Sequence, residues 1–224
     1  MVSIFAVKIE DKLSDYYIKL LMDYVLKEKE EQINRYVFKA DANRTLVGDV
    51  LVRFLIRKKL NISNEQIHFE SNKYGKKRLM GRNDFHFNIS HSGEWVVCSM
   101  GNYENGIDVE KIQPIDIDLV KRIFKRSEYL HIKNMKLENQ SQEFIRIWTL
   151  KESYIKCIGK GLSIPLDSFE FEKVNDEFKL KGKEQNKYKL EQMQLNDEYY
   201  VAICSYKEEV DKKINYIDIA QLLQ

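Results

Sequence analysis

Two short segments contain the residue types that bind metal ions and phosphates. The segment GIDVE contains Asp108 and Glu110, and its alternation of apolar residues with carboxylates predicts a strand with both carboxylates on one face. The segment WTLKESYIK is typical of a helix, with Glu152 and Lys156 one turn apart on a single stripe. If the strand and the helix pack together, three carboxylates and an ammonium converge. Such a site suits Mg²⁺, which proteins hold with a few carboxylates plus waters and substrate phosphates.

Taken alone, the helical segment also has an ordinary structural explanation. A Glu four residues before a Lys is a common helix pair, worth about 0.3 kcal/mol, and Trp148 on the same stripe fits a plain core position. The convergence of all three carboxylates with Lys156 favours the functional interpretation. We therefore expect a Mg²⁺-assisted reaction at a phosphate.

Length and composition narrow the class of protein. With 224 residues, 43% of them hydrophobic, and only two prolines, the chain is one large domain or two small ones with a real core. The net charge of +2 is too small to indicate a nucleic-acid partner. The start lacks the pattern of a signal peptide, and no apolar run approaches the ~18 residues of a membrane span. We expect a soluble, cytoplasmic protein without a membrane partner.

The three cysteines, Cys98, Cys157 and Cys204, lie far apart in apolar neighbourhoods. No CxxC motif or Cys/His cluster occurs, which argues against a zinc site. None of the three has the cationic or helix-start setting that lowers a thiol pKa, so we expect buried, reduced thiols rather than a catalytic cysteine.

The order of the predicted elements indicates an α+β fold made of two similar lobes. Apolar periodicity predicts helices at 13–34, 39–60 and 143–158, a helix-rich stretch at 114–142, and strands at 2–9, 67–70, 85–89, 95–100, 106–110, 168–174, 188–194, 199–205 and 214–217. A helix followed by three strands thus occurs twice. We expect an N-terminal lobe over 1–103, a C-terminal lobe over 104–224, and a functional site at their junction.

Three further polar segments are candidates for contact with an anion. The segment FHFNISHS places Ser90 and His91 at a strand end, where side chains commonly meet ligands; a simple turn with an exposed histidine is the alternative. The basic turn YGKKR contains Lys76, and Arg44 with Thr45 lies near the start of the second predicted helix, where negative charge is favoured. A solvated loop and a surface cap are the corresponding alternatives.

Taken together and in this order, the motifs resemble those of the Sfp-type 4′-phosphopantetheinyl transferases. The resemblance covers about residues 1–206 and rests on ANRTLVGDVLVR, YGK, FNISHS, GIDVE, WTLKESYIK and GKGLSIPL. A GxD motif with a distant WxxKE motif is specific as a pair, and the NISHS segment in the correct order makes chance agreement a poor explanation.

The resemblance implies a two-lobed pseudo-dimer that binds coenzyme A in the cleft between the lobes. The N-terminal lobe would face the adenosine and phosphates, and the C-terminal lobe would supply the Mg²⁺ carboxylates and face the carrier protein. The implied reaction moves the phosphopantetheinyl arm to a serine of an apo peptidyl, acyl or aryl carrier protein and releases adenosine 3′,5′-bisphosphate. The implied coenzyme A contacts are Lys29, Arg44, Thr45, Lys76, Ser90, His91 and Lys156, and the implied Mg²⁺ ligands are Asp108, Glu110 and Glu152.

On this interpretation Glu152 and Lys156 are the catalytic residues. Lys156 would neutralise or protonate the leaving phosphate, while His91 and Lys76 hold other phosphates. Phosphoryl transfer depends on positioning and charge neutralisation more than on covalent catalysis, and Mg²⁺ would neutralise charge at the pyrophosphate. The acceptor serine needs a base, for which Glu152, directly or through a metal-bound water, is the candidate.

Three positions depart from the family pattern. Asn43 stands where histidine is frequent, and Lys77 stands where proline commonly follows the YGK turn. Lys29 matches a family lysine near the 3′-phosphate of coenzyme A, but Gln32 takes the place of a second lysine. The candidates for a compensating cation are Arg35 and Lys39.

The carrier protein is expected on the C-terminal lobe. Because family carriers are acidic along the helix after their serine, basic and apolar groups should meet them. One candidate surface is the insert at 115–136, and another is the stretch from Lys160 onward; for the insert, an ordinary amphipathic surface helix is the alternative. The basic and apolar candidates within the insert are Lys121, Arg122, Phe124, Lys125 and Arg126. Two lobes in one chain make the cleft without a partner copy, so we expect a monomer.

Two other classes of function stay open at this point. One is a different metal-dependent phosphotransferase or phosphohydrolase that uses the same three carboxylates. The other is a non-catalytic binding protein descended from an enzyme. The joint presence of the GIDVE and WTLKES segments disfavours the first, and the intact Asp108, Glu110, Glu152 and Lys156 disfavour the second.

Overall fold

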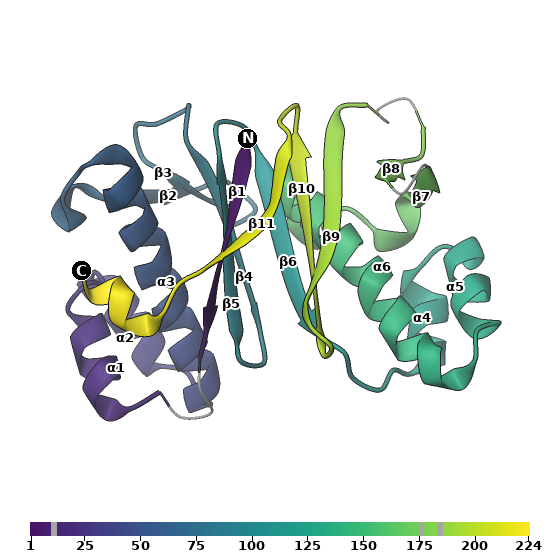
Figure 1. The fold of residues 1–224 in the computed structure, drawn as a ribbon, viewed down its shortest axis with the longest axis horizontal. Coiled ribbons are helices and arrows are strands. Elements are labelled where there is room, and N and C mark those ends of the chain that lie inside the picture. Colours follow the sequence, from purple (N-terminus) through teal and green to yellow (C-terminus); the bar gives the residue numbers. More distant parts are fainter. Residues whose placement is uncertain (10–12, 175–176, 183–185) are drawn as a thin grey trace.

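The computed structural model describes residues 1–9, 13–174, 177–182 and 186–224. It contains two sheets in the middle of the molecule, with the helices of each half on the outer sides (Figure 1). This arrangement confirms the predicted α+β fold with two lobes. No helix in the described part of the chain is both long enough and apolar enough to cross a membrane.

The N-terminal lobe contains a four-stranded sheet with the order β11-β1-β5-β4, and helix α3 provides much of the core that covers it. Its elements before residue 103 are β1 (Val2–Lys8), α1 (Asp15–Met22), α2 (Lys27–Asn34), α3 (Lys39–Leu60), β2 (Phe69–Ser71), β3 (Lys77–Leu79), β4 (His86–Ser92) and β5 (Trp95–Gly101). The strands β2 and β3 form a separate hairpin with a turn at Gly75, whose φ of 89° favours glycine.

The C-terminal lobe repeats this plan with a five-stranded sheet, β6-β10-β9-β8-β7. Its elements are β6 (Asn105–Lys111), α4 (Ile117–Ile123), α5 (Arg126–Lys133), α6 (Leu137–Ile158), β7 (Phe171–Val174), β8 (Glu177–Leu180), β9 (Tyr188–Asn196) and β10 (Tyr199–Tyr206). The last strand, β11 (Val210–Tyr216), follows them in sequence but belongs to the first sheet. The long helices α3 and α6 both have 22 residues, and both end at a left-handed residue, Asn61 and Gly159. The two halves are therefore similar in plan, as the repeated order of elements predicted.

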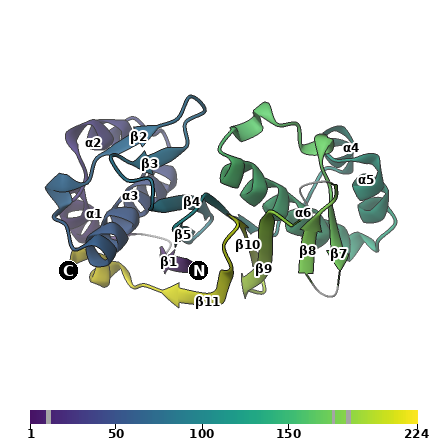
Figure 2. The ribbon, with the colours of Figure 1, turned by 90° about the horizontal axis from the view of Figure 1, so that it is seen from above.

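The two sheets pack against each other through an apolar layer. Val2, Ile4 and Val97 of the first sheet share a buried cluster with Ile107 and Val109 of the second. Ile107 and Val109 are both 0% exposed, so the predicted alternation of GIDVE is confirmed and its carboxylates lie on the other face of β6. Strands β4 and β6 thereby lie close together at the junction of the lobes (Figures 1 and 2).

The last strand, β11, returns to the N-terminal lobe. After β10 the chain crosses back and pairs in parallel with β1, and the final turn, Ile219–Leu223, packs on α1 and α3 (Figure 2). Residues 210–224 thus add to the first lobe in space, a difference from the division by sequence order at residue 104. Local periodicity does not contain this information, because the register of a distant parallel strand depends on tertiary packing.

The helix predicted over 13–34 is broken into α1 and α2. Ser14 caps α1 by accepting a hydrogen bond from the Tyr17 amide at 3.3 Å, and the helix ends at Asp23. Leu21 and Ile33 are 12 residues apart and would lie about 120° apart around one continuous helix. The break allows both side chains to enter the same core, where they are buried.

Candidate active site

Strand β4 lies between two groups of polar side chains, because successive residues of a strand point to opposite faces. Ser90 and Ser92 point toward β6, where Ser90 Oγ donates to Asp108 Oδ1 at 2.9 Å and Ser92 Oγ donates to Glu110 Oε2 at 2.8 Å. His91 faces the other way and lines a cavity in the N-terminal lobe. The NISHS segment therefore connects the carboxylates to that cavity. It is a strand rather than a simple turn, although His91 is exposed, as the alternative expected.

The carboxylate side of the site is built by β6 and α6. Lys156 Nζ lies 2.6 Å from Asp108 Oδ1 and donates to Ser90 Oγ at 2.9 Å. Asp108 is only 2% exposed, so a charged partner is required to hold it there. Helix α6 packs closely on β6, since a Cβ on Gly106 would approach backbone atoms of that helix to 2.2 Å. This close approach brings the WTLKES motif of α6 against the GIDVE motif of β6.

Burial and mutual repulsion raise the pKa of two of these carboxyls. The pKa of Glu110 is raised to about 7, first because burial removes water from the charged form and then because Asp108 is negatively charged. The hydrogen bond from Ser92 partly opposes this shift. The pKa of Glu152 is also raised, by burial and by Asp108. Asp108 therefore lies near enough to affect both Glu110 and Glu152.

The oxygen atoms at this position fit a divalent cation. Asp108 Oδ2 and Glu152 Oε1 are buried, and neither has a hydrogen-bond partner among the described residues. Unpaired buried carboxylate oxygens are costly unless something positive meets them. The arrangement is not closed around an ion, however: within the described part of the chain, no three His, Cys, Asp or Glu side chains form a metal-binding group. The donor chemistry suits Mg²⁺, which retains waters and substrate oxygens as ligands.

The other side of β4 faces a cavity of about 210 Å³ in the N-terminal lobe. Apolar side chains form one part of its wall, including Val52, Phe69, Phe87 and Ile89. Polar and charged residues form the rest: Lys29, Arg44, Thr45, Asp49, Lys77 and His91. Four of the predicted coenzyme A contacts, Lys29, Arg44, Thr45 and His91, therefore line one cavity. An apolar wall beside several cations suits a nucleotide with its phosphates.

Positive charge in this cavity affects His91. Its pKa is lowered by partial burial, and next by the charges of Arg44 and Lys156. A histidine whose protonation is disfavoured by neighbouring cations gains a proton more readily when an anion enters. Lys156 thus acts electrostatically on both sides of β4.

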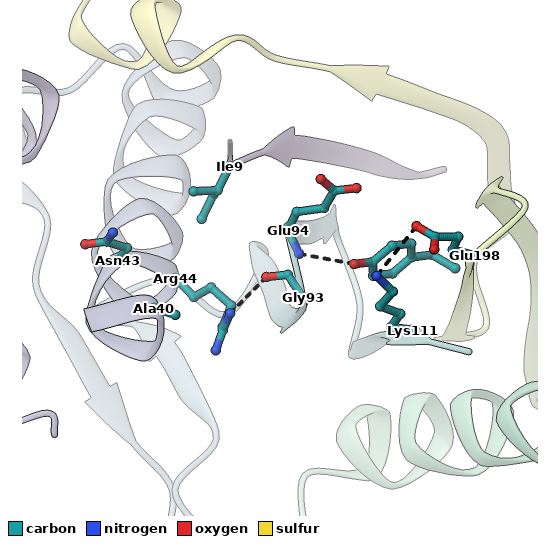
Figure 3. Close-up of a pocket in the computed structure, with 9 residues that line it drawn as sticks. Ile9, Ala40, Asn43, Arg44, Gly93, Glu94, Lys111 and Glu198 are labelled. Carbon is teal, nitrogen blue, oxygen red and sulfur yellow. Dashed lines mark hydrogen bonds and ion pairs between the residues drawn. The ribbon is translucent and has the colours of Figure 1, made fainter. Parts of the chain in front are cut away.

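Arg44 lies at the boundary between this cavity and a second one of about 320 Å³. Its guanidinium donates to the carbonyl of Gly93 at 2.9 Å (Figure 3). It also pairs with Asp41 at 2.5 Å. Asn43, the departure from the frequent histidine, lines the second cavity rather than the first (Figure 3). The substitution at position 43 therefore lies outside the group of cations around His91.

Lys76 has a different set of partners from the one predicted. Its ammonium donates to Glu104 Oε2 at 2.6 Å, to the Asn105 carbonyl at 2.9 Å and to the Cys157 carbonyl at 3.0 Å. A lysine ammonium has three protons, so all of them are used between the hairpin and the C-terminal lobe. Burial alone would raise the pKa of Glu104, but the hydrogen bond from His86 and the charge of Lys76 lower it to about 2. In this structure Lys76 joins the lobes instead of pointing at a free phosphate position.

Some residues of the site were absent from the sequence-based prediction. Ser92 holds Glu110, and Asn88 Oδ1 accepts a hydrogen bond from the Ile107 amide at 2.9 Å, which fixes β4 against β6. The period of two along NISHS would have identified both as neighbours of Ser90. Glu104 had no such signal, because its partner Lys76 is distant in sequence. Lys77 belongs to the basic YGKKR turn, but the sequence did not distinguish it from Lys76, because its partner Asp49 is also distant.

Comparisons with known proteins cover both lobes of the chain. A family model described as "4′-phosphopantetheinyl transferase superfamily" matches residues 104–204, and one described as "4′-phosphopantetheinyl transferase, N-terminal" matches residues 13–101. The 4′-phosphopantetheinyl transferase Sfp of Bacillus subtilis is 34% identical over 98% of this chain and 99% of its own length. The 4′-phosphopantetheinyl transferase gsp of Aneurinibacillus migulanus is 42% identical over 77% of this chain and 72% of its own.

A more distant relative extends the comparison beyond bacteria. The human L-aminoadipate-semialdehyde dehydrogenase-phosphopantetheinyl transferase is 31% identical over 80% of this chain and 66% of its own. The bacterial matches extend across both lobes, including the strand and helix that carry the three carboxylates. The chain therefore belongs to the Sfp-like 4′-phosphopantetheinyl transferases and is a transferase.

Proposed function

We propose that this protein moves the phosphopantetheinyl arm of coenzyme A to a serine hydroxyl of an apo peptidyl or acyl carrier protein, with Mg²⁺ as cofactor. The observation that carries the proposal is the arrangement at β4, where buried carboxylates with unpaired oxygens and Lys156 lie on one side and a cationic cavity lies on the other. A pyrophosphate is stabilised both by a metal ion held by carboxylates and by cationic side chains. The names of the relatives Sfp and gsp, both 4′-phosphopantetheinyl transferases, support transfer of this arm.

Asp108, Glu110 and Glu152 would hold the Mg²⁺ ion. Bound there, it would neutralise charge that develops on the pyrophosphate oxygens. The chain itself prepares the position: Ser92 orients Glu110, and Ser90 with Lys156 orients one oxygen of Asp108, leaving the other oxygen unpaired. The raised pKa values of Glu110 and Glu152 are expected to fall when positive charge enters.

The proposed reaction is a displacement at the phosphorus that carries the pantetheine arm. The carrier serine oxygen forms a bond to this phosphorus, and the bond to the other phosphate breaks. The adenosine 3′,5′-bisphosphate leaves with the electron pair, and Lys156 neutralises or protonates its new terminal oxygen. Positioning and charge compensation supply most of the rate in such transfers.

Glu152 is our candidate for the base that accepts the serine proton, directly or through a water. Burial raises its pKa, which makes the carboxylate a better proton acceptor than an exposed glutamate. Its Oε1 has no hydrogen-bond partner in the described residues, so that oxygen is available. Lys156 is one helical turn away and can stabilise the negative charge of Glu152 before the transfer.

The carrier protein is proposed to meet the surface of α4, α5 and the segment after α6. Leu119, Leu130, Leu137 and Leu162 expose between 40% and 84% of their surface there. Basic residues lie in the last turns of α4 and α5. Phe124, one of the predicted contacts, is instead 3% exposed and stacks on Phe144 at 5.2 Å, so it supports the surface from below. An acidic, partly apolar helix is the matching partner.

The test is to incubate the protein with coenzyme A, Mg²⁺ and a panel of apo carrier proteins. Carrier mass is followed by intact-protein mass spectrometry, and released adenosine 3′,5′-bisphosphate by chromatography. A transferase gives equal amounts of modified carrier and bisphosphate. A phosphohydrolase gives bisphosphate without modified carrier, and a binding protein gives neither; each of these two results rejects the proposal. The same samples run by size-exclusion chromatography test the expected monomer.

A further inference from the structure

Adjacent lysines after the hairpin turn point to opposite sides of β3. Lys76 points to the C-terminal lobe, where three acceptors use its ammonium. Lys77 lines the cavity of the N-terminal lobe. This is the alternation expected of extended chain. The turn at Gly75 therefore supplies one lysine that joins the lobes and one that lines the cavity.

The position of Lys77 is fixed by two neighbours. Its ammonium lies 3.4 Å from Asp49 Oδ1 and 5.4 Å from the centre of the Phe69 ring. Asp49 has a closer partner, since Arg53 Nε lies 2.8 Å from its other oxygen and both side chains are buried. Asp49 thus orients Lys77, but its single negative charge cannot neutralise both Lys77 and Arg53. The Lys77 side chain remains 42% exposed, so it can be reached from the cavity.

Lys29 reaches the same cavity from α2. Its ammonium donates to Gln32 Oε1 at 3.0 Å, a neutral acceptor. Its pKa is lowered by burial and next by the charge of Lys77, with Asp49 opposing. Two ammonium groups that repel each other across a cavity are stabilised by an anion that binds both.

We propose that Lys77 and Lys29 together bind the phosphate monoester on the ribose of coenzyme A, with Lys77 supplying the cation that Gln32 does not. The inference rests on the proposed function, because it takes coenzyme A as the ligand. A phosphate monoester is the fitting group: it carries close to two negative charges and three acceptor oxygens, enough for both ammonium groups.

The two residues expected to compensate for Gln32 do not occupy this position. Arg35 is paired with Glu31 at 3.9 Å and its side chain is 81% exposed. Lys39 lines a different cavity, beside Leu13 and Met22. Among the described residues that line the cavity of Lys29, neither appears. Two of the three departures from the family pattern, Gln32 and Lys77, instead both lie near Lys29.

The test compares coenzyme A with 3′-dephospho-coenzyme A, which lacks only this monoester. We expect Lys77→Met to raise the KM for coenzyme A about tenfold or more while the KM for the dephospho compound stays the same, the usual loss for a charge-assisted contact. Lys77→Arg should keep most of the discrimination. Lys59→Met, an exposed lysine on α3 outside the cavity, is the matched control and should change neither value.

A second variant separates a ligand contact from a structural effect. Gln32→Lys in the Lys77→Met background should restore part of the discrimination, because it returns a second ammonium beside Lys29. An unchanged ratio of the two KM values in Lys77→Met overturns the inference. If the wild-type protein transfers no arm, the proposed function fails; calorimetric binding of coenzyme A and its dephospho form to the same variants still decides the role of Lys77.

Discussion

The two sides of β4 carry opposite charge. Toward the C-terminal lobe, Ser90 and Ser92 hold carboxylates whose oxygens need a cation. Toward the N-terminal lobe, His91 joins a group of cations that can bind phosphate directly. One strand thus separates a side suited to reaction chemistry from a side suited to binding. Substitutions on the first side should lower kcat, and those on the second side should raise KM for coenzyme A.

Asp108→Asn should have the largest effect. It removes a negative charge from the proposed Mg²⁺ site and weakens the contact to Lys156, so we expect kcat to fall on the order of 10³-fold. Steady-state transfer to an apo carrier measures this. Near-UV circular dichroism should show an intact fold, because the amide retains the shape of the carboxylate. A variant with normal kcat would show that the carboxylate side does not carry the chemistry.

Lys156→Met should lower kcat by about 10²-fold, since the leaving phosphate would lose the ammonium proposed to neutralise it. The KM for coenzyme A should change less, because other cations still bind the phosphates. Lys19→Met, an exposed lysine on α1, is the control. A rise in KM with an unchanged kcat would assign Lys156 to the binding side instead.

Glu110→Gln tests how much folding stability the protein loses by burying Glu110 beside Asp108. The folded-state pKa of Glu110 is about 7, above its ordinary value of 4.5. A carboxyl whose pKa is raised by folding lowers the free energy of unfolding at high pH. This loss of stability begins as the pH rises above about 4.5 and is complete above about 7. We expect the variant to be more stable than wild type by about 1–3 kcal/mol at pH 8 without metal, and equal at pH 4.

Thermal or urea unfolding at the two pH values measures this difference. Glu138→Gln, an exposed glutamate on α6, should show no such pH-dependent gain. The Glu110→Gln variant should also lose activity. A less stable variant at pH 8 would mean that Glu110 is already compensated in the free protein, contrary to its burial beside Asp108.

Arg44→Met should have the smallest of these effects, and the effect should be on binding of coenzyme A rather than on kcat. We expect the KM for coenzyme A to rise about tenfold with kcat changed less than threefold, because Arg44 borders the cationic cavity and does not contact the carboxylates. Arg35→Met, at the exposed arginine paired with Glu31, is the matched control and should leave KM unchanged. A kcat loss in Arg44→Met larger than its KM increase would erase the distinction between the two sides.

Local sequence patterns predicted those features of the site that depend on residues close together in the sequence. The period of two in GIDVE placed Asp108 and Glu110 correctly opposite the core, and the period of a helix placed Glu152 near Lys156. The long helices α3 and α6 were also predicted, with ends at Asn61 and Gly159.

The remaining features depend on contacts between distant segments. The parallel pairing of β11 with β1 joins the two ends of the chain. The separate roles of Lys76 and Lys77 depend on which lobe each side chain reaches, and both lysines look alike in the sequence as parts of a basic turn. The break between α1 and α2 depends on a core that Leu21 and Ile33 share. These three features are determined by the packing of the folded protein, not by local sequence.

The most direct test of the account is the dependence of kcat on Mg²⁺ at saturating coenzyme A and apo carrier, measured for wild type and Asp108→Asn. The account predicts that wild-type kcat rises from near zero in EDTA to a plateau with Mg²⁺. Asp108→Asn should stay low and need much more Mg²⁺ for any increase. Full wild-type activity in EDTA, or the same Mg²⁺ dependence in both proteins, would contradict the claim that the carboxylate side of β4 holds the metal and carries the transfer.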